Sequence, residues 1–134
     1  MTTWLVDTAL LKMSGSPGPS PLRRWCETRK PSLFLSAVSL CEISAAIEKR
    51  LDRRDALRDW LAGLTERFAD RVHNVDVAIS REAGAILPRL AHAHPLHRRH
   101  DAILVATARA YGHGLLTRRD AVFRPWTQTP IEVI

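Results

Sequence analysis

Short apolar runs alternate with segments of helical periodicity along the chain, and the two patterns together predict its secondary structure. Runs of three or four mostly apolar residues are too short for helices and are typical of buried strands. Such runs predict strands at residues 4–6, 33–35, 72–75, 115–117 and 131–133.

Between these strands, apolar residues recur at the three- and four-residue spacing of a helix face. A stretch rich in Ser, Pro and Gly predicts a loop at residues 13–21, followed by a short helix that carries Leu22, Trp25 and Cys26. Further helices are predicted from Ser39 through Leu51, from Arg54 through Phe68, from Val77 through His92 and from Asp101 through Ala110, before Gly112 and Gly114. Pro88 removes a backbone donor, so we expect a kink or break there.

The predicted order is β-α-β-α-α-β-α-α-β-β, which is typical of an α/β fold with a parallel sheet. We therefore expect a three-layer sandwich with a four- or five-stranded parallel sheet flanked by helices. The 134 residues fit a single domain over residues 1–134. In such folds, ligands bind beyond the carboxyl ends of the strands.

The net charge of +6 and the pI of about 10.3 favour a polyanionic partner such as nucleic acid. The basic residues are seventeen Arg and three Lys, and the guanidinium fork of Arg suits phosphate. Genomic base composition would produce the same Arg bias. Charge therefore indicates a class of partner and leaves the reaction open.

The remaining composition indicates a cytoplasmic protein. Cys26 and Cys41 lie in predicted helices without metal-type spacing, which predicts reduced, buried thiols. The first thirteen residues hold Asp7 within a short apolar run and lack a basic leader. We expect neither a signal peptide nor a membrane span.

Acidic residues stand where the predicted fold would place a ligand. Asp7 directly follows the first strand, while Glu42 and Asp101 lie at predicted helix starts. Each has an ordinary explanation: Asp7 as a strand terminator, Glu42 in a capping box with Ser39, and Asp101 as a favourable charge near a helix N-terminus. Asp120 lies in a polar loop, where acids are common.

The apolar neighbours of Asp7 and Asp101 weaken those ordinary explanations. Burial of an unpaired carboxylate is costly, and a bound cation would remove that cost. Mg²⁺ prefers oxygen ligands, and such a cation assists phosphodiester hydrolysis.

Three segments resemble the PIN-domain ribonucleases, in particular the VapC-type toxins of bacterial toxin–antitoxin pairs. These segments are WLVDTALL at 4–11, FLSAVSLCEISAAIEKR at 34–50 and HDAILVATARAYGHGLLTRRDAVF at 100–123. Their order and spacing also fit the family, and together they span almost the whole chain.

The resemblance implies a Mg²⁺- or Mn²⁺-dependent endoribonuclease that forms a homodimer and is inhibited by a cognate antitoxin. Carried over by motif, the metal ligands and catalytic acids are Asp7, Glu42, Asp101 and Asp120. Thr8 matches a hydroxyl that orients the first Asp, and Thr117 matches a hydroxyl at the end of the fourth strand.

The chain departs from the family pattern at two positions. Ala9 stands where Asn or Ser is common, and Arg119 stands where a small polar residue is common. These departures favour an alternative, a catalytically silent module that keeps the fold and binds RNA or a partner. A third hypothesis is a metal-dependent phosphatase that acts on small substrates.

Other features fit the surface or the core better than a site. The spacing of His92, His94, His97 and His100 matches no standard zinc site, so we interpret them as solvated loop residues. Paired arginines at 23–24, 53–54 and 98–99 are interpreted as solvated faces. Trp25, Trp60 and Phe68 lie on apolar helix stripes and are expected in the core or a dimer interface.

Overall fold

The fold is taken from a computed structural model that describes residues 2–90, 98–119, 123 and 130–134. The strands are β1 (Thr3–Val6), β2 (Ser32–Ser36), β3 (Val72–His73), β4 (Gly114–Thr117) and β5 (Ile131–Val133). The helices are α1 (Thr8–Ser14), α2 (Pro21–Arg29), α3 (Ala37–Glu48), α4 (Arg54–Arg67), α5 (Val77–Ile86), the 3₁₀ turn η1 (Leu87–Arg89) and α6 (Arg98–Tyr111).

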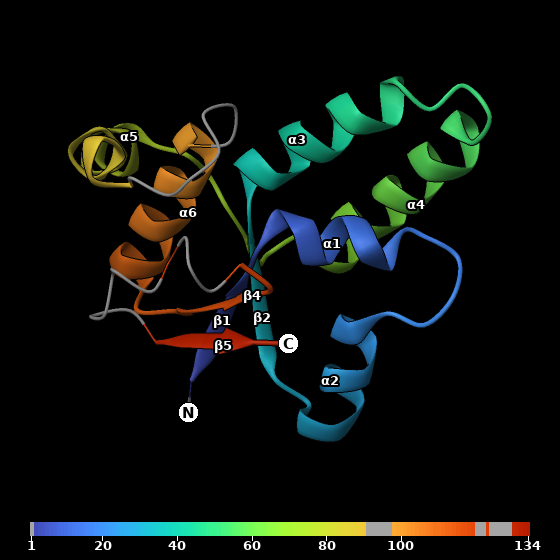
Figure 1. Ribbon diagram of the computed structural model, residues 1–134, viewed down its shortest axis with the longest axis horizontal. Helices are drawn as coiled ribbons and strands as arrows, with labels where there is room; N and C mark the ends of the chain where they lie inside the picture. Colours follow the sequence, from blue (N-terminus) through green and yellow to red (C-terminus); the bar gives the residue numbers. More distant parts are fainter. Residues whose placement is uncertain (1, 91–97, 120–122, 124–129) are drawn as a thin grey trace.

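The strands form one five-stranded sheet in the order β3-β2-β1-β4-β5, with every pairing parallel (Figure 1). The central strand β1 pairs with β2 on one side and β4 on the other. Val6 lies opposite Leu116, and the Asp7 amide donates to the Leu116 carbonyl at 2.9 Å. Parallel pairing therefore brings the carboxyl ends of β1 and β4 together.

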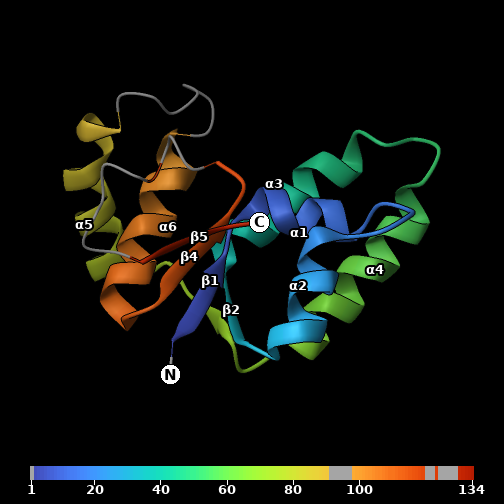
Figure 2. The same cartoon turned by 60° about the horizontal axis from the view of Figure 1, so that its bottom comes forward.

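Helices cover both faces of the sheet, as the three-layer prediction requires (Figure 2). On one face, Leu5 and Leu115 are fully buried with Leu104 of α6 and residues of α5. On the other, Val6 and Leu116 are buried with residues of α1 to α4. Successive strand residues point to opposite faces, so this alternation divides the core into two layers.

The sequence pattern predicts a loop at residues 13–21 and no helix between it and the first strand, but the structure has a helix there. Helix α1 begins directly after Asp7, and its Leu10 and Leu11 are buried. Seven residues are too few for a stable isolated helix, so packing rather than local periodicity forms it.

Two predicted helix starts were also displaced. Helix α3 begins at Ala37, and its N-cap is Ser36, whose hydroxyl accepts from the Val38 amide at 3.2 Å. The capping box of Ser39 and Glu42 is therefore wrong. Helix α6 begins at Arg98 rather than Asp101. The break at Pro88 is confirmed, because α5 ends at Ile86 and Pro88 lies in η1.

The expectation of two buried thiols is half wrong. Both cysteines are free, but only Cys26 is partly buried, and Cys41 is exposed on α3. Trp25 lies in the core, and Trp60 and Phe68 pack against it, as expected for apolar helix stripes. Within the described ranges, no helix has the length and apolar character needed to span a membrane.

Candidate active site

A pair of buried aspartates lies beyond the carboxyl ends of β1 and β4. Asp7 follows β1 directly, and Asp101 comes from the first turn of α6. The Thr117 hydroxyl, at the end of β4, donates to Asp7 Oδ2 at 2.7 Å. This bond follows from the strand register, which places Thr117 next to Asp7.

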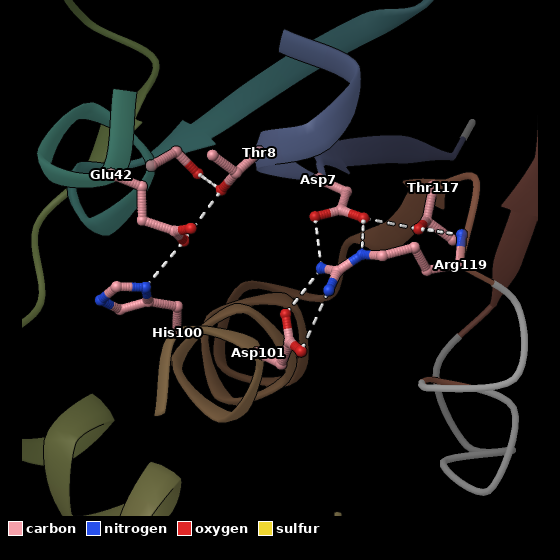
Figure 3. Close-up of polar contacts among 8 residues, drawn as sticks. Asp7, Thr8, Glu42, His100, Asp101, Thr117 and Arg119 are labelled. Atoms are coloured by element: carbon pink, nitrogen blue, oxygen red, sulfur yellow. Dashed lines mark hydrogen bonds and ion pairs between the residues drawn. The ribbon is translucent and has the colours of Figure 1, made fainter. Parts of the chain in front are cut away.

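The Arg119 guanidinium bridges the two aspartates (Figure 3). Its Nε and Nη2 donate to Asp7 Oδ2 and Oδ1 at 2.9 and 2.8 Å. Its Nη1 and Nη2 donate to Asp101 Oδ2 and Oδ1 at 3.2 and 2.6 Å. Every carboxylate oxygen of the pair therefore accepts a charge-assisted hydrogen bond from one side chain.

Burial and charge shift the pKa values of this group in opposite ways. Burial raises the pKa of Asp101 above its usual range, and the charges of Asp7 and Glu42 add to this, while the hydrogen bond and charge of Arg119 lower it. Burial lowers the pKa of Arg119, but the bonds to both aspartates outweigh it and raise that pKa overall. Arg119 is thus held as a cation between two acids.

Glu42 belongs to a second set of polar contacts beside the aspartate pair, formed with Thr8, Ser39 and His100 (Figure 3). Its Oε1 accepts from the Thr8 hydroxyl at 3.4 Å, and the Thr8 and Ser39 hydroxyls are 2.7 Å apart. His100 Nδ1 lies 3.1 Å from the same Glu42 oxygen. The charge of Glu42 adds to the rise in the pKa of Asp101.

The predicted site residues are divided between the contacts around Arg119 and the contacts around Glu42. Asp7, Asp101 and Thr117 meet at Arg119, while Thr8 faces Glu42 rather than the Asp7 carboxylate that the resemblance assigns to it. Asp120 lies outside the described residues.

Sequence reasoning missed the roles of Arg119 and His100. Arg119 departs from the family pattern, and this departure is the signal for its role in the sequence. The interpretation of the four histidines as solvated loop residues is wrong for His100, which lies in α6 and contacts Glu42. His92, His94 and His97 lie outside the described residues.

The donor chemistry of the site fits a hard divalent cation, because buried carboxylate oxygens are ligands that Mg²⁺ prefers. The position between Asp7 and Asp101 is already a cation position, since the guanidinium lies there. In the part of the chain that the structure describes, no three acidic, imidazole or thiol side chains converge as a preformed metal site. The chemistry of the carboxylates fits a metal ion, but in this structure Asp7 and Asp101 are arranged around the guanidinium of Arg119.

Comparison with known protein families identifies the family of this chain. The PIN domain family model matches residues 5–125. No curated protein sequence matches the chain.

Several solved structures share the fold. FitAcB from Neisseria gonorrhoeae has a TM-score of 0.78 at 20% identity, covering 96% of both chains. DNA-bound VapBC from Salmonella typhimurium has a TM-score of 0.71 at 20% identity, covering 99% of this chain and 98% of that one. VapBC-1 from nontypeable Haemophilus influenzae has a TM-score of 0.70 at 15% identity, covering 98% of each. The chain belongs to the PIN domain family, whose members are typically nucleases.

Proposed function

We propose that the chain is an endoribonuclease that depends on Mg²⁺, with Mn²⁺ as the other cation suited to its ligands. One observation carries this proposal: two buried carboxylates from separate elements, Asp7 and Asp101, share one cation position beyond the carboxyl ends of β1 and β4. Burial of two such charges is costly unless a cation neutralises them, and ionisable groups with shifted pKa values cluster at functional sites.

Each residue has a defined part in the proposed site. Asp7 and Asp101 would hold the cation, and Glu42 would add a carboxylate from α3. Asp120 is the fourth proposed acid, on the motif alone. The Thr117 hydroxyl fixes the orientation of the Asp7 carboxylate through its 2.7 Å bond. A cation held by these residues would polarise the phosphoryl oxygen of the substrate and would lower the pKa of water there.

The charge of the chain supports a nucleic acid as the substrate class, and the resemblance to the PIN-domain ribonucleases favours RNA. A net charge of +6 attracts a polyanion, while the acids concentrate negative charge in one buried place. The attraction therefore brings the phosphodiester to the protein, and the acidic site supplies the chemistry. We expect cleavage to weaken as salt rises, because phosphate contacts release counterions.

The biological role we propose is that of the toxin in a type II toxin–antitoxin pair, acting as a cytoplasmic homodimer with a cognate antitoxin. The shared fold supports this: one similar structure is a toxin–antitoxin complex from Klebsiella pneumoniae, with a TM-score of 0.66 at 21% identity. Growth arrest on induced expression in a bacterial host, absent for Asp7→Asn, would test this role.

A second candidate function is a catalytically silent module that binds RNA or a partner. The observation that favours it is Arg119, which occupies the cation position with four hydrogen bonds. In that case the bridge would be permanent, and the acids would serve only to hold Arg119.

Cleavage of end-labelled RNA separates the two functions. The wild-type protein is incubated with RNA in Mg²⁺ and in EDTA, alongside Asp7→Asn and the matched control Asp70→Asn, whose side chain is 93% exposed. We expect cleavage in Mg²⁺, none in EDTA, and a loss of ~100-fold or more in Asp7→Asn, because a ligand to the cation is removed. Asp70→Asn should cleave like the wild type.

Two outcomes would contradict the nuclease. Equal cleavage in all four reactions would reveal a contaminating activity, and no cleavage by folded wild-type protein on any structured or single-stranded RNA would favour the silent module. Circular dichroism of each variant verifies that the fold is retained.

A further inference from the structure

Arg119 forms a bridge that closes the acidic site. Its guanidinium makes four hydrogen bonds of 2.6–3.2 Å, two to each aspartate. The Asp7 and Asp101 side chains are 0% and 2% exposed, whereas the Arg119 side chain is 30% exposed (Figure 3). The bridge therefore lies at the mouth of the site, with the acids beneath it.

The bridge uses the same oxygens that a divalent cation would need. A Mg²⁺ ion bound by both carboxylates at about 2.0–2.1 Å from their oxygens would take the position between Asp7 and Asp101 that the guanidinium fills. A divalent cation and the Arg119 guanidinium, both in contact with the same two carboxylates, would also repel each other strongly. Arg119 and a divalent cation therefore exclude each other.

Two further contacts hold the bridge without burying it completely. The Arg119 amide donates to the Thr117 hydroxyl at 2.9 Å, and that hydroxyl in turn donates to Asp7. The guanidinium carbon lies 5.3 Å from the centre of the Phe123 ring. Because the side chain retains access to solvent, rotation about its own bonds can release the guanidinium while the buried acids stay in place.

We propose that Arg119 is an exchangeable internal counter-ion, which neutralises Asp7 and Asp101 in the metal-free protein and must be displaced before a divalent cation binds. This inference rests on the cation site of the proposed function and adds a regulatory property to it. Affinity for the metal then depends on the fraction of molecules with Arg119 released. If that fraction is ~1–10%, the apparent dissociation constant is raised ~10- to 100-fold.

Calorimetric titration with Mn²⁺ tests the exchange without RNA. The proteins are the wild type, Arg119→Gln and the matched control Arg118→Gln. The control removes the same charge from an exposed neighbour, whose guanidinium donates to Met13 Sδ at 3.5 Å. We expect Arg119→Gln to bind Mn²⁺ ~10- to 100-fold more tightly than the wild type. Arg118→Gln should differ from the wild type by less than about twofold, since the charge of an exposed side chain is screened by salt.

The outcomes distinguish the exchange from the cation site itself. Equal Mn²⁺ affinity of the wild type and Arg119→Gln would overturn the exchange and leave the site intact. Equal tightening in both Arg variants would also overturn it, because charge alone would then explain the gain. No heat from any of the three proteins would overturn the exchange together with the proposed function.

A measurement on the wild-type protein guards against a variant that fails to fold. Phenylglyoxal modifies accessible guanidinium groups, and mass spectrometry measures the extent at Arg119 and, as an internal reference, at Arg118. We expect saturating Mn²⁺ to increase modification of Arg119 severalfold and to leave Arg118 unchanged. Protection of Arg119 that is the same with and without Mn²⁺ would overturn the exchange.

Discussion

Two groups of interacting side chains lie against the same sheet, one built on buried aspartates and one partly exposed, and they are stabilised in different ways. The acidic site (Asp7, Asp101, Thr117 and Arg119) lies beyond the carboxyl ends of β1 and β4. The second group, here the imidazole cluster, contains Thr3, Phe34, His73, Tyr111 and His113. In this cluster His113 directly precedes β4 and bonds Thr3, the first residue of β1.

The imidazole cluster satisfies its polar atoms by hydrogen bonding and stacking. His73 and His113 join through their Nε2 atoms at 2.8 Å. Both rings stack against Phe34, with ring centroids 5.2 Å apart for His73 and 4.4 Å apart for His113. The Tyr111 ring stacks on His73, with centroids 3.7 Å apart. Burial lowers the pKa of both histidines, and the charge of His73 lowers that of His113 further.

The comparison shows which buried group needs a cation. An imidazole pair loses its charge near neutral pH and becomes self-sufficient, because one ring donates and the other accepts. The carboxylate pair is neutralised by Arg119, whose raised pKa keeps it charged. A cluster that needs a counter-ion is suited to exchange one, whereas the neutral cluster is suited to a structural role.

The largest expected effect tests the counter-ion directly. In metal-free buffer, Arg119→Gln leaves two buried carboxylates without their cation, and we expect the free energy of unfolding to fall by about 3–5 kcal/mol. Urea denaturation measures it. The control Arg118→Gln should fall by less than about 0.5 kcal/mol, since its side chain is exposed. Equal stability of the two variants would show that the bridge contributes nothing to the fold.

A smaller effect is expected from the hydroxyl that supports the bridge. Thr117→Val removes the donor to Asp7 and the acceptor for the Arg119 amide. A hydrogen bond to a charged group contributes about 1.5–3 kcal/mol, so we expect a loss of about 2 kcal/mol in urea denaturation. The exposed Thr65→Val, which loses only a bond to the Leu61 carbonyl, is the control. A loss no larger than that of the control contradicts the prediction.

The smallest effect concerns the imidazole cluster and pH. Unfolded histidine titrates near 6.5, and the folded pKa values of His73 and His113 lie lower. Between these values the unfolded chain binds more protons, so stability is complete above pH 6.5 and declines as the pH falls.

Removal of one imidazole should reduce that decline. We expect the fall in Tm from pH 7 to pH 5 to be smaller in His73→Gln than in the wild type by about 2–4 °C, as measured by thermal denaturation followed by circular dichroism. Parallel curves for the two proteins would show that the cluster does not titrate in this range.

The sequence by itself determined the strands, their parallel arrangement and the edge at which the acids gather. Short apolar runs are local signals, and parallel connectivity then places Asp7 and Thr117 at neighbouring strand ends. The break at Pro88 was equally local, because proline removes its own backbone donor.

Only the tertiary structure decided the features that depend on distant partners. Helix α1 forms because Leu10 and Leu11 find a core, and Ser36 rather than Ser39 caps α3 while Ser39 pairs with Thr8, 31 residues away. The Arg119 bridge joins residues separated by 112 and 18 positions. A long side chain with five donors has many partners within reach along a chain, and only the folded arrangement of Asp7 and Asp101 selects these two.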